Sequence, residues 1–222
     1  MLKQPMCLLA FFALVLVSLA GCDRASAAGA PLPKATVDAP LATAKGSETA
    51  VFAGGCFWGI QAVFQHVKGV TSATSGYSGG SATTAEYETV STGTTGHAES
   101  VKVVYDPSQV SFGQLLQVFF SVAHDPTELN RQGPDVGTQY RSAIFYSNDE
   151  QKRIADAYIS QLSAAKLFGR PIVTQVAHLE AFYPAEAYHQ DYATLHPKNP
   201  YIMINDAPKV ANLKKEFPEL YK

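Results

Sequence analysis

The sequence is poor in cysteine, in net charge and in long hydrophobic runs. Its 222 residues include three cysteines and carry a formal net charge of −2. It contains no basic run and no basic motif interleaved with aromatic residues, which argues against a nucleic-acid partner. It also contains no Cys-x-x-Cys or His-Glu-x-x-His motif, so we expect neither a metal nor another cofactor. A chain of this length that is 46% hydrophobic can build one domain with a substantial core.

The longest apolar run lies at the amino terminus. Lys3 precedes an almost wholly apolar stretch at residues 6–20, which is shorter than the roughly 20 residues of a spanning helix. A positive charge followed by a short apolar core is typical of an export signal. The stretch ends in the sequence LAGC at residues 19–22, which resembles the bacterial lipoprotein cleavage box.

That resemblance implies a lipoprotein signal peptide at residues 1–21 and a lipid on the sulfur of Cys22. Asp23 follows directly and, by resemblance to enterobacterial lipoproteins, favours retention at the inner membrane. We therefore expect a periplasmic protein of the cell envelope, anchored to the membrane by lipid. A plain secretory signal cut after Ala27 is the alternative.

Residues 22–47 are rich in alanine, proline, serine, threonine and lysine, and they show no hydrophobic periodicity. Such a composition predicts a flexible tether. The tether would hold a folded domain, residues 48–222, away from the membrane.

The start of this domain predicts a strand, a glycine turn and a helix. Residues 50–53 form a short apolar run, Gly54 and Gly55 interrupt it, and apolar residues then recur at helical spacing from residue 60 to 64. Cys56 falls where the helix begins. The amino end of a helix favours a thiolate, so we expect an accessible sulfur with a pKa below the usual value of about 8.5. A buried structural cysteine is the alternative.

The rest of the chain alternates strands with helices. We expect strands at residues 70–74, 99–105, 141–146 and 172–177, helices at 111–124, 147–168, 185–195 and 210–216, a tight loop at 76–80 and a short extended piece at 87–90. This alternation predicts an α/β (α+β) fold, in which a mixed, mainly antiparallel sheet and a layer of helices form a two-layer sandwich with long functional loops.

Five ordered motifs resemble the signatures of the A-type peptide-methionine sulfoxide reductase family. They are GGCFWG at residues 54–59, GYSGG at 76–80, GHAE at 96–99, GTQYRS at 137–142 and HQDY at 189–192. The resemblance covers about residues 48–200. It implies a ferredoxin-like two-layer plait with long loops around the site. It also implies reduction of the S epimer of methionine sulfoxide in proteins or peptides.

The resemblance also implies which residues carry this reaction. Cys56 would attack the sulfoxide sulfur, and Glu99 would hydrogen-bond and protonate the sulfoxide oxygen. Burial beside Phe57 and Trp58 would raise the pKa of Glu99 and keep it neutral. An exposed carboxylate at the start of a strand is the alternative for Glu99.

Four further residues are expected to hold the substrate. Phe57 and Trp58 can form a small apolar pocket for the methyl group, and core packing is the alternative for both. Tyr87 and Tyr140 match the family phenols that orient the sulfoxide oxygen. Asp135 matches the family's water-binding aspartate.

The sequence departs from many members of the family after the first step. No cysteine follows Cys56, whereas many relatives resolve the oxidised cysteine with further cysteines near the carboxyl terminus. Cys7 would leave with the signal peptide, and Cys22 would be acylated or removed. We therefore expect a monomeric one-cysteine enzyme whose sulfenic acid is attacked by an external thioredoxin-like thiol.

Two other function classes stay open at this point. Cys56 and His97 could form the Cys–His pair of a hydrolase or acyltransferase. Alternatively, the chain could be a non-catalytic lipoprotein that binds exported peptides. We expect His97 to be a hydrogen-bonding loop residue, and residues 189–192 to shape the rim of the pocket.

Overall fold

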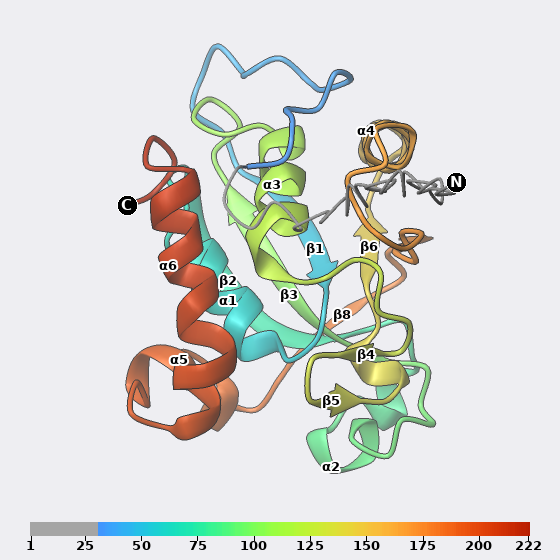
Figure 1. The fold of residues 1–222 in the computed structure, drawn as a ribbon. Helices are drawn as coiled ribbons and strands as arrows, with labels where there is room; N and C mark the ends of the chain where they lie inside the picture. The colour runs from blue at the N-terminus through green and yellow to red at the C-terminus, as the bar shows by residue number, and fades with distance from the viewer. Residues whose placement is uncertain (1–30) are drawn as a thin grey trace, which may run out of the picture.

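The computed structural model describes residues 31–222, and Figure 1 shows how their elements are arranged. A six-stranded sheet has the order β7-β6-β1-β3-β2-β8. Its strands are β1 (Glu48–Ala53), β2 (Val70–Ser78), β3 (Ala98–Tyr105), β6 (Ala143–Tyr146), β7 (Gln175–His178) and β8 (Phe182–Pro184). All neighbours are antiparallel except β6 and β7, which are parallel. The expected mixed, mainly antiparallel sheet is confirmed.

The main core lies between one face of this sheet and the helices. These are α1 (Phe57–Gln65), α3 (Phe112–Val118) with its π-helical continuation Phe119–Ala123, α4 (Asp149–Ala164) and α6 (Ala207–Glu216). Phe52 of β1 is fully buried, and its ring stacks on rings from α1 and α3. Val51 and Ala53 point to the opposite face, where they belong to a smaller cluster. Helices thus cover one face of the sheet, as the expected two-layer sandwich requires.

Shorter elements surround the carboxyl end of β1. They are α2 (Tyr87–Val90), the hairpin of β4 (Arg131–Gln132) and β5 (Asp135–Val136), α5 (Tyr192–Leu195), and single turns at Ala82–Thr84, Thr138–Tyr140, Ala187–His189 and Ile202–Asp206. In Figure 1, α6 (red) lies beside α1, and the β4–β5 hairpin and α2 lie below the end of β1. None of the helices between residues 31 and 222 is long and apolar enough to cross a bilayer.

Three expected local structures are corrected. Residues 87–90 form a short helix rather than an extended piece. β2 continues through Ser78, so most of the expected tight loop at residues 76–80 is strand paired with β3 and β8. The helix expected at residues 185–195 is broken, because Asp191 has a positive φ of 58° that no α-helix accommodates.

The flexible tether expected at residues 22–47 is corrected for residues 31–47, which pack against the domain. Apolar side chains at residues 32, 35, 37 and 39 contact the core. Polar side chains of α3 and α4 bind the backbone of this segment: Gln117 donates to the carbonyl of Leu32, and Tyr158 donates to the carbonyl of Pro33 at 2.8 Å. These contacts replace the water that a disordered segment would bind, so the segment is a strap on the fold. The predicted signal peptide, Cys22 and residues 22–30 lie outside the described residues.

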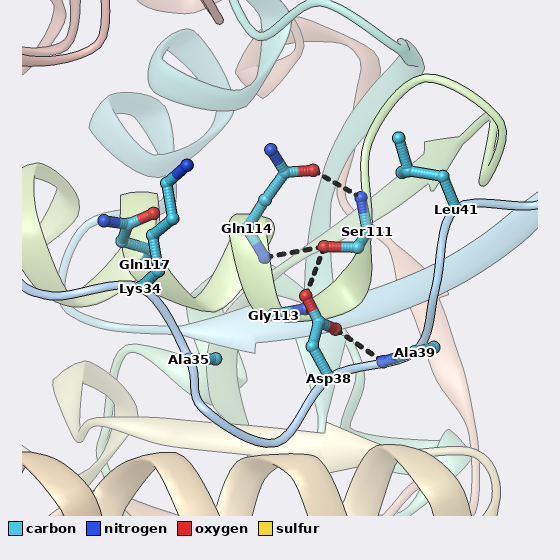
Figure 2. Close-up of a pocket in the computed structure, with 9 residues that line it drawn as sticks. All are labelled: Lys34, Ala35, Asp38, Ala39, Leu41, Ser111, Gly113, Gln114 and Gln117. Carbon is cyan, nitrogen blue, oxygen red and sulfur yellow. Dashed lines mark hydrogen bonds between the residues drawn. The ribbon is translucent and has the colours of Figure 1, made fainter.

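Asp38 of this strap caps α3. Its Oδ1 accepts from the backbone N–H of Gly113 at 2.9 Å, and its Oδ2 accepts from the hydroxyl of Ser111, the N-cap residue. Figure 2 shows this arrangement in the hollow between the strap and the start of α3. The strap therefore completes a helix end that would otherwise bind water.

Replacing Asp38 by alanine tests the strap. The free energy of unfolding is expected to fall by about 1 kcal/mol, because a helix-end N–H and the capping hydroxyl lose their acceptor. Urea denaturation measures the change, with Glu219→Ala as a control at an exposed acid. Equal stability of Asp38→Ala and the unsubstituted chain would contradict a packed strap.

Candidate active site

Cys56 lies between the end of β1 and the start of α1, as predicted. Gly55 turns the chain there with a φ of +93°, a conformation that favours glycine. A Cβ at Gly54 would come within 2.8 Å of the His124 ring, so the turn also needs a residue without a side chain at that position. Cys56 is the N-cap residue of α1 and is free, with 8% of its surface exposed.

The expected low pKa of this thiol is wrong. Burial raises the pKa of Cys56 well above its usual value, and the negative charges of Glu99 and Asp206 raise it further. At this helix end the backbone N–H of Phe57 donates to Glu99 at 3.0 Å, and the backbone N–H of Trp58 lowers the pKa of the thiol by less than burial raises it. The resting residue is therefore an uncharged thiol.

Glu99 lies near the start of β3 and is 3% exposed. Burial raises its pKa to about 8, although the hydrogen bond from Phe57 opposes the shift. This agrees with the expected neutral carboxylic acid, and the burial of Glu99 shows that the exposed-carboxylate alternative is wrong. Glu99 accepts a hydrogen bond from the residue next to Cys56, so the expected proton donor and the expected nucleophile share one end of α1.

The two aromatic residues after Cys56 take different positions. Phe57 is 1% exposed, and its ring lies 5.1 Å from the ring of His189. Trp58 is partly exposed, stacks on Tyr192 with 3.9 Å between ring centroids, and donates from Nε1 to His189 Nδ1 at 3.2 Å. Trp58 can therefore form an open wall beside the sulfur, while Phe57 supports the site from within the core.

Tyr87 and Tyr140 approach the same site from separate elements, α2 and the turn Thr138–Tyr140. Burial raises the pKa of both hydroxyls, and the charges of Glu99 and Cys56 raise it further. Both phenols therefore keep their protons at neutral pH and can donate hydrogen bonds. The structure brings them together with the thiol and the acid, as the sequence predicted.

Asp135 opens β5 and is half-buried. Its Oδ2 accepts a short hydrogen bond from the hydroxyl of Tyr201, and burial raises its pKa. Tyr201 in turn packs edge-on against Trp58, with 6.0 Å between ring centroids. Asp135 is thereby linked to the aromatic wall rather than isolated on the hairpin.

The fold and these contacts belong to one domain, and that domain matches a known family over nearly its whole length. Residues 48–221 match the family model described as peptide methionine sulfoxide reductase. The chain belongs to this family. It is an enzyme, and its reaction is the thiol-dependent reduction of methionine sulfoxide.

Individual relatives agree with this membership. The chain is 67% identical over 178 residues to peptide methionine sulfoxide reductase MsrA 2 of Mesorhizobium japonicum, which covers 80% of this chain and 91% of the relative. It is 51% identical over 192 residues to the MsrA 2 of a Synechocystis species, and the match covers 86% of this chain and 90% of the relative.

Solved structures share the fold. Methionine sulfoxide reductase A of Corynebacterium diphtheriae superposes with a TM-score of 0.60 at 37% identity, covering 76% of this chain and 84% of that one. Reduced Mxr1 of Saccharomyces cerevisiae superposes with a TM-score of 0.62 at 31% identity, covering 74% of this chain and 92% of that one.

His97 does not serve this reductase as a base. Its Nδ1 accepts from the backbone N–H of Gly80 at 3.2 Å, and its Nε2 donates to the carbonyl of Ser81 at 2.9 Å. Both ring nitrogens are therefore used to hold the loop after β2, as expected. The Cys–His hydrolase alternative lacks its base, and the family membership disfavours it together with the non-catalytic alternative.

Three residues that the carboxyl-terminal segment brings to the reductase site were not predicted from the sequence. They are Tyr201, Asp206 and Lys209. No motif marks them, and the last helix was expected to begin at residue 210 rather than at Ala207. Pro208 in the first turn of α6 is a helix-start signal that could have placed this helix earlier. Among residues 31–222, no cluster of His, Cys, Asp or Glu side chains is arranged to hold a metal ion.

Proposed function

We propose that this reductase acts on the S epimer of methionine sulfoxide in proteins or peptides, using Cys56 as its single thiol and a thioredoxin-like protein as its external reductant. One observation carries the proposal: a neutral, buried Glu99 accepts a hydrogen bond from the backbone N–H of Phe57, the residue next to Cys56. The epimer follows from the A-type family resemblance. The external reductant follows from the absence of any cysteine after Cys56.

The substrate would lie between the aromatic wall and the two phenols. Trp58 offers an open apolar face to the methyl group and sulfur, and such contacts are worth about 0.3–1.5 kcal/mol each. Tyr87 and Tyr140 would donate hydrogen bonds to the sulfoxide oxygen, which holds the sulfur toward Cys56. Asp135 would hold a water at the edge of this pocket, next to Tyr201.

The reaction then balances with these groups and solvent. The Cys56 thiol first loses its proton to solvent, and the thiolate attacks the sulfoxide sulfur while Glu99 gives its proton to the oxygen, which leaves as hydroxide. A sulfur–sulfur bond forms and the sulfur–oxygen bond breaks. Hydroxide then attacks the Cys56 sulfur, and methionine departs with the electron pair of the broken sulfur–sulfur bond. Cys56 is oxidised to a sulfenic acid and the substrate is reduced.

Recovery of the thiol needs two external thiol groups. The first attacks the Cys56 sulfenic acid and forms a mixed disulfide with loss of water. The second attacks this disulfide and releases the Cys56 thiol. A thioredoxin-like dithiol supplies both groups in one molecule.

A single turnover without reductant tests this cycle. The full chain is mixed with a methionine sulfoxide peptide, trapped with dimedone and examined by peptide mass spectrometry. We expect one methionine formed per chain and the dimedone adduct on Cys56. An intramolecular disulfide between Cys22 and Cys56 would contradict the one-cysteine cycle.

The ionisation of Cys56 and Glu99 predicts that kcat/KM rises with pH up to about pH 8. Attack needs Cys56 without its proton and Glu99 with its own. The pKa of Glu99 is about 8 and that of Cys56 is raised well above its usual range, so Glu99 ionises first in the free enzyme. In the reactive form only one of the two protons remains, and it is carried by Glu99. Its population rises with pH up to about 8 and falls once both protons are lost.

We therefore expect kcat/KM to increase from pH 6 to about 8 and to fall only at higher pH. Initial rates with dithiothreitol at low sulfoxide concentration measure the profile, after correction for the ionisation of the reductant. A kcat/KM that decreases steadily from pH 6 to 9 would contradict the assignment of the two protons.

We also propose that the enzyme is a lipoprotein, anchored through Cys22 to the periplasmic face of the inner membrane. The apolar run at residues 6–20 and the sequence LAGC at residues 19–22 support this proposal. Metabolic labelling with palmitate tests it: the label is expected in the unsubstituted chain and lost in Cys22→Ser. Label retained in Cys22→Ser would contradict the anchor.

A further inference from the structure

A second buried carboxylate lies beside the catalytic thiol. Asp206 ends the turn Ile202–Asp206, and it is fully buried. Lys209, in the first turn of α6, donates to Asp206 Oδ1 at 3.2 Å, and its side chain is 17% exposed. Asp206 Oδ2 has no hydrogen-bond partner within residues 31–222. Such burial is costly for a carboxylate, which points to a role for its position.

Gly59 fixes where this carboxylate lies relative to Cys56. A Cβ at Gly59 would be 2.2 Å from Asp206 Oδ1 and 2.8 Å from Lys209 Nζ, so the ion pair fills the space over this glycine. Gly59 is three positions after Cys56, the N-cap residue of α1. Gly59 is also the third residue of α1. The Asp206 carboxylate therefore lies over the first turn of the helix that begins directly after Cys56.

Two acidic side chains thus lie at the amino end of α1. The neutral Glu99 accepts a hydrogen bond from the backbone N–H of Phe57, and the Asp206 carboxylate lies over Gly59. The unpaired N–H groups and the dipole of a helix stabilise negative charge at this end. Asp206 already places a negative charge there, so a thiolate would add a second one beside it. After burial, which is the largest cause, Glu99 and then Asp206 raise the pKa of the thiol, whereas the backbone N–H of Trp58 and the charge of Lys209 oppose them.

The other titratable groups around the sulfur are uncharged or paired. Burial raises the pKa of the hydroxyls of Tyr87, Tyr140 and Tyr201, so these residues are neutral at pH 7. Asp135 accepts from Tyr201. Lys209 is already bound to Asp206, so its charge is largely compensated at the sulfur.

We propose that Asp206, anchored by Lys209, is a positioning residue that keeps Cys56 as an uncharged thiol in the resting enzyme. The inference rests on the proposed function, because it concerns the same nucleophile between turnovers. A thiol reacts slowly with electrophiles and oxidants, since the thiolate is the nucleophilic form. A one-cysteine reductase benefits from this, because residues 31–222 hold no second cysteine to rescue Cys56 after stray oxidation.

Alkylation of the resting enzyme tests the proposal without any sulfoxide. The full chain is treated with iodoacetamide from pH 6 to 10, and modification of Cys56 is followed by peptide mass spectrometry. Asp206→Asn keeps the side-chain shape, removes the negative charge and leaves Lys209 in place. We expect alkylation at pH 8 to become about fivefold faster and the profile to move to lower pH, because the rate follows the thiolate fraction.

A second variant and a matched control complete the test. Asp206→Ser removes the same charge with a smaller side chain and should shift the profile in the same direction. Glu219→Gln changes an exposed acid of the same carboxyl-terminal region and should leave the profile unchanged. Circular dichroism and a cooperative urea transition show that each variant is folded.

Unchanged or slower alkylation in folded Asp206→Asn and Asp206→Ser would overturn the proposal. Failure of the proposed function would show differently, as turnover that survives Cys56→Ser. The alkylation profile needs no turnover, so the two failures are distinguishable.

Discussion

Cys56→Ser is expected to abolish steady-state reduction of a dabsylated methionine sulfoxide peptide by dithiothreitol. A serine hydroxyl stays protonated at any working pH, and its oxygen cannot accept the sulfoxide oxygen as a sulfur atom does. We expect activity at least roughly a thousandfold below that of the unsubstituted chain, because no other group in the site can act as the nucleophile. The serine is nearly isosteric, so the fold should be unaffected.

Cys22→Ser is the matched control for this prediction. It changes another cysteine to serine, outside the described residues, and should leave turnover with dithiothreitol unchanged. Activity that survives Cys56→Ser but is lost in Cys22→Ser would contradict the account, since it would move the nucleophile to the amino-terminal segment.

Glu99→Gln is expected to lower kcat by about 10²–10⁴-fold, with a much smaller change in KM. The glutamine amide keeps the size of the side chain and can still bind the sulfoxide oxygen, but it has no proton to give. Because the loss occurs mainly in the transition state, it should appear in kcat rather than in substrate binding. Initial rates over a range of peptide concentrations separate the two parameters.

Glu88→Gln provides the control for this variant. Glu88 is an exposed acid on α2, next to Tyr87, so the substitution changes a nearby charge without touching the proposed proton donor. Its kcat should equal that of the unsubstituted chain. A Glu99→Gln enzyme with an unchanged kcat would show that the oxygen receives its proton from another group.

The sequence predicted the position of the nucleophile well because its signals are local. The apolar run, Gly54 and Gly55 lie within a few residues of Cys56, and together they define a strand, a turn and a helix start. Glu99 was found from the motif that contains it, and its raised pKa followed from its largest cause, burial. Both predictions depend on neighbours close in sequence or on a single physical effect.

The charge state of Cys56 could not be predicted in the same way. It depends on which groups occupy the amino end of α1, and these come from β3 and from the carboxyl-terminal segment. A helix end by itself favours a thiolate, whereas burial and the acidic side chains of Glu99 and Asp206 oppose one here. The sequence pattern shows the helix but not the distant carboxylates.

The strap was missed for a related reason. Its apolar residues are few and follow neither helical nor strand periodicity, so the sequence resembles a linker. Its order comes instead from partners elsewhere in the chain, such as Gln117 of α3 and Tyr158 of α4. Segments without regular structure of their own become predictable only once the surface that binds them is known.

The central claim is that a neutral Glu99 lies beside the Cys56 thiol in the resting enzyme, and infrared difference spectroscopy tests it most directly. The spectrum of the unsubstituted chain minus that of Glu99→Gln should contain the C=O band of a protonated carboxylic acid at pH 7. This band should disappear as the pH rises through about 8. A carboxylate band already present at pH 7, with no protonated acid, would contradict the account.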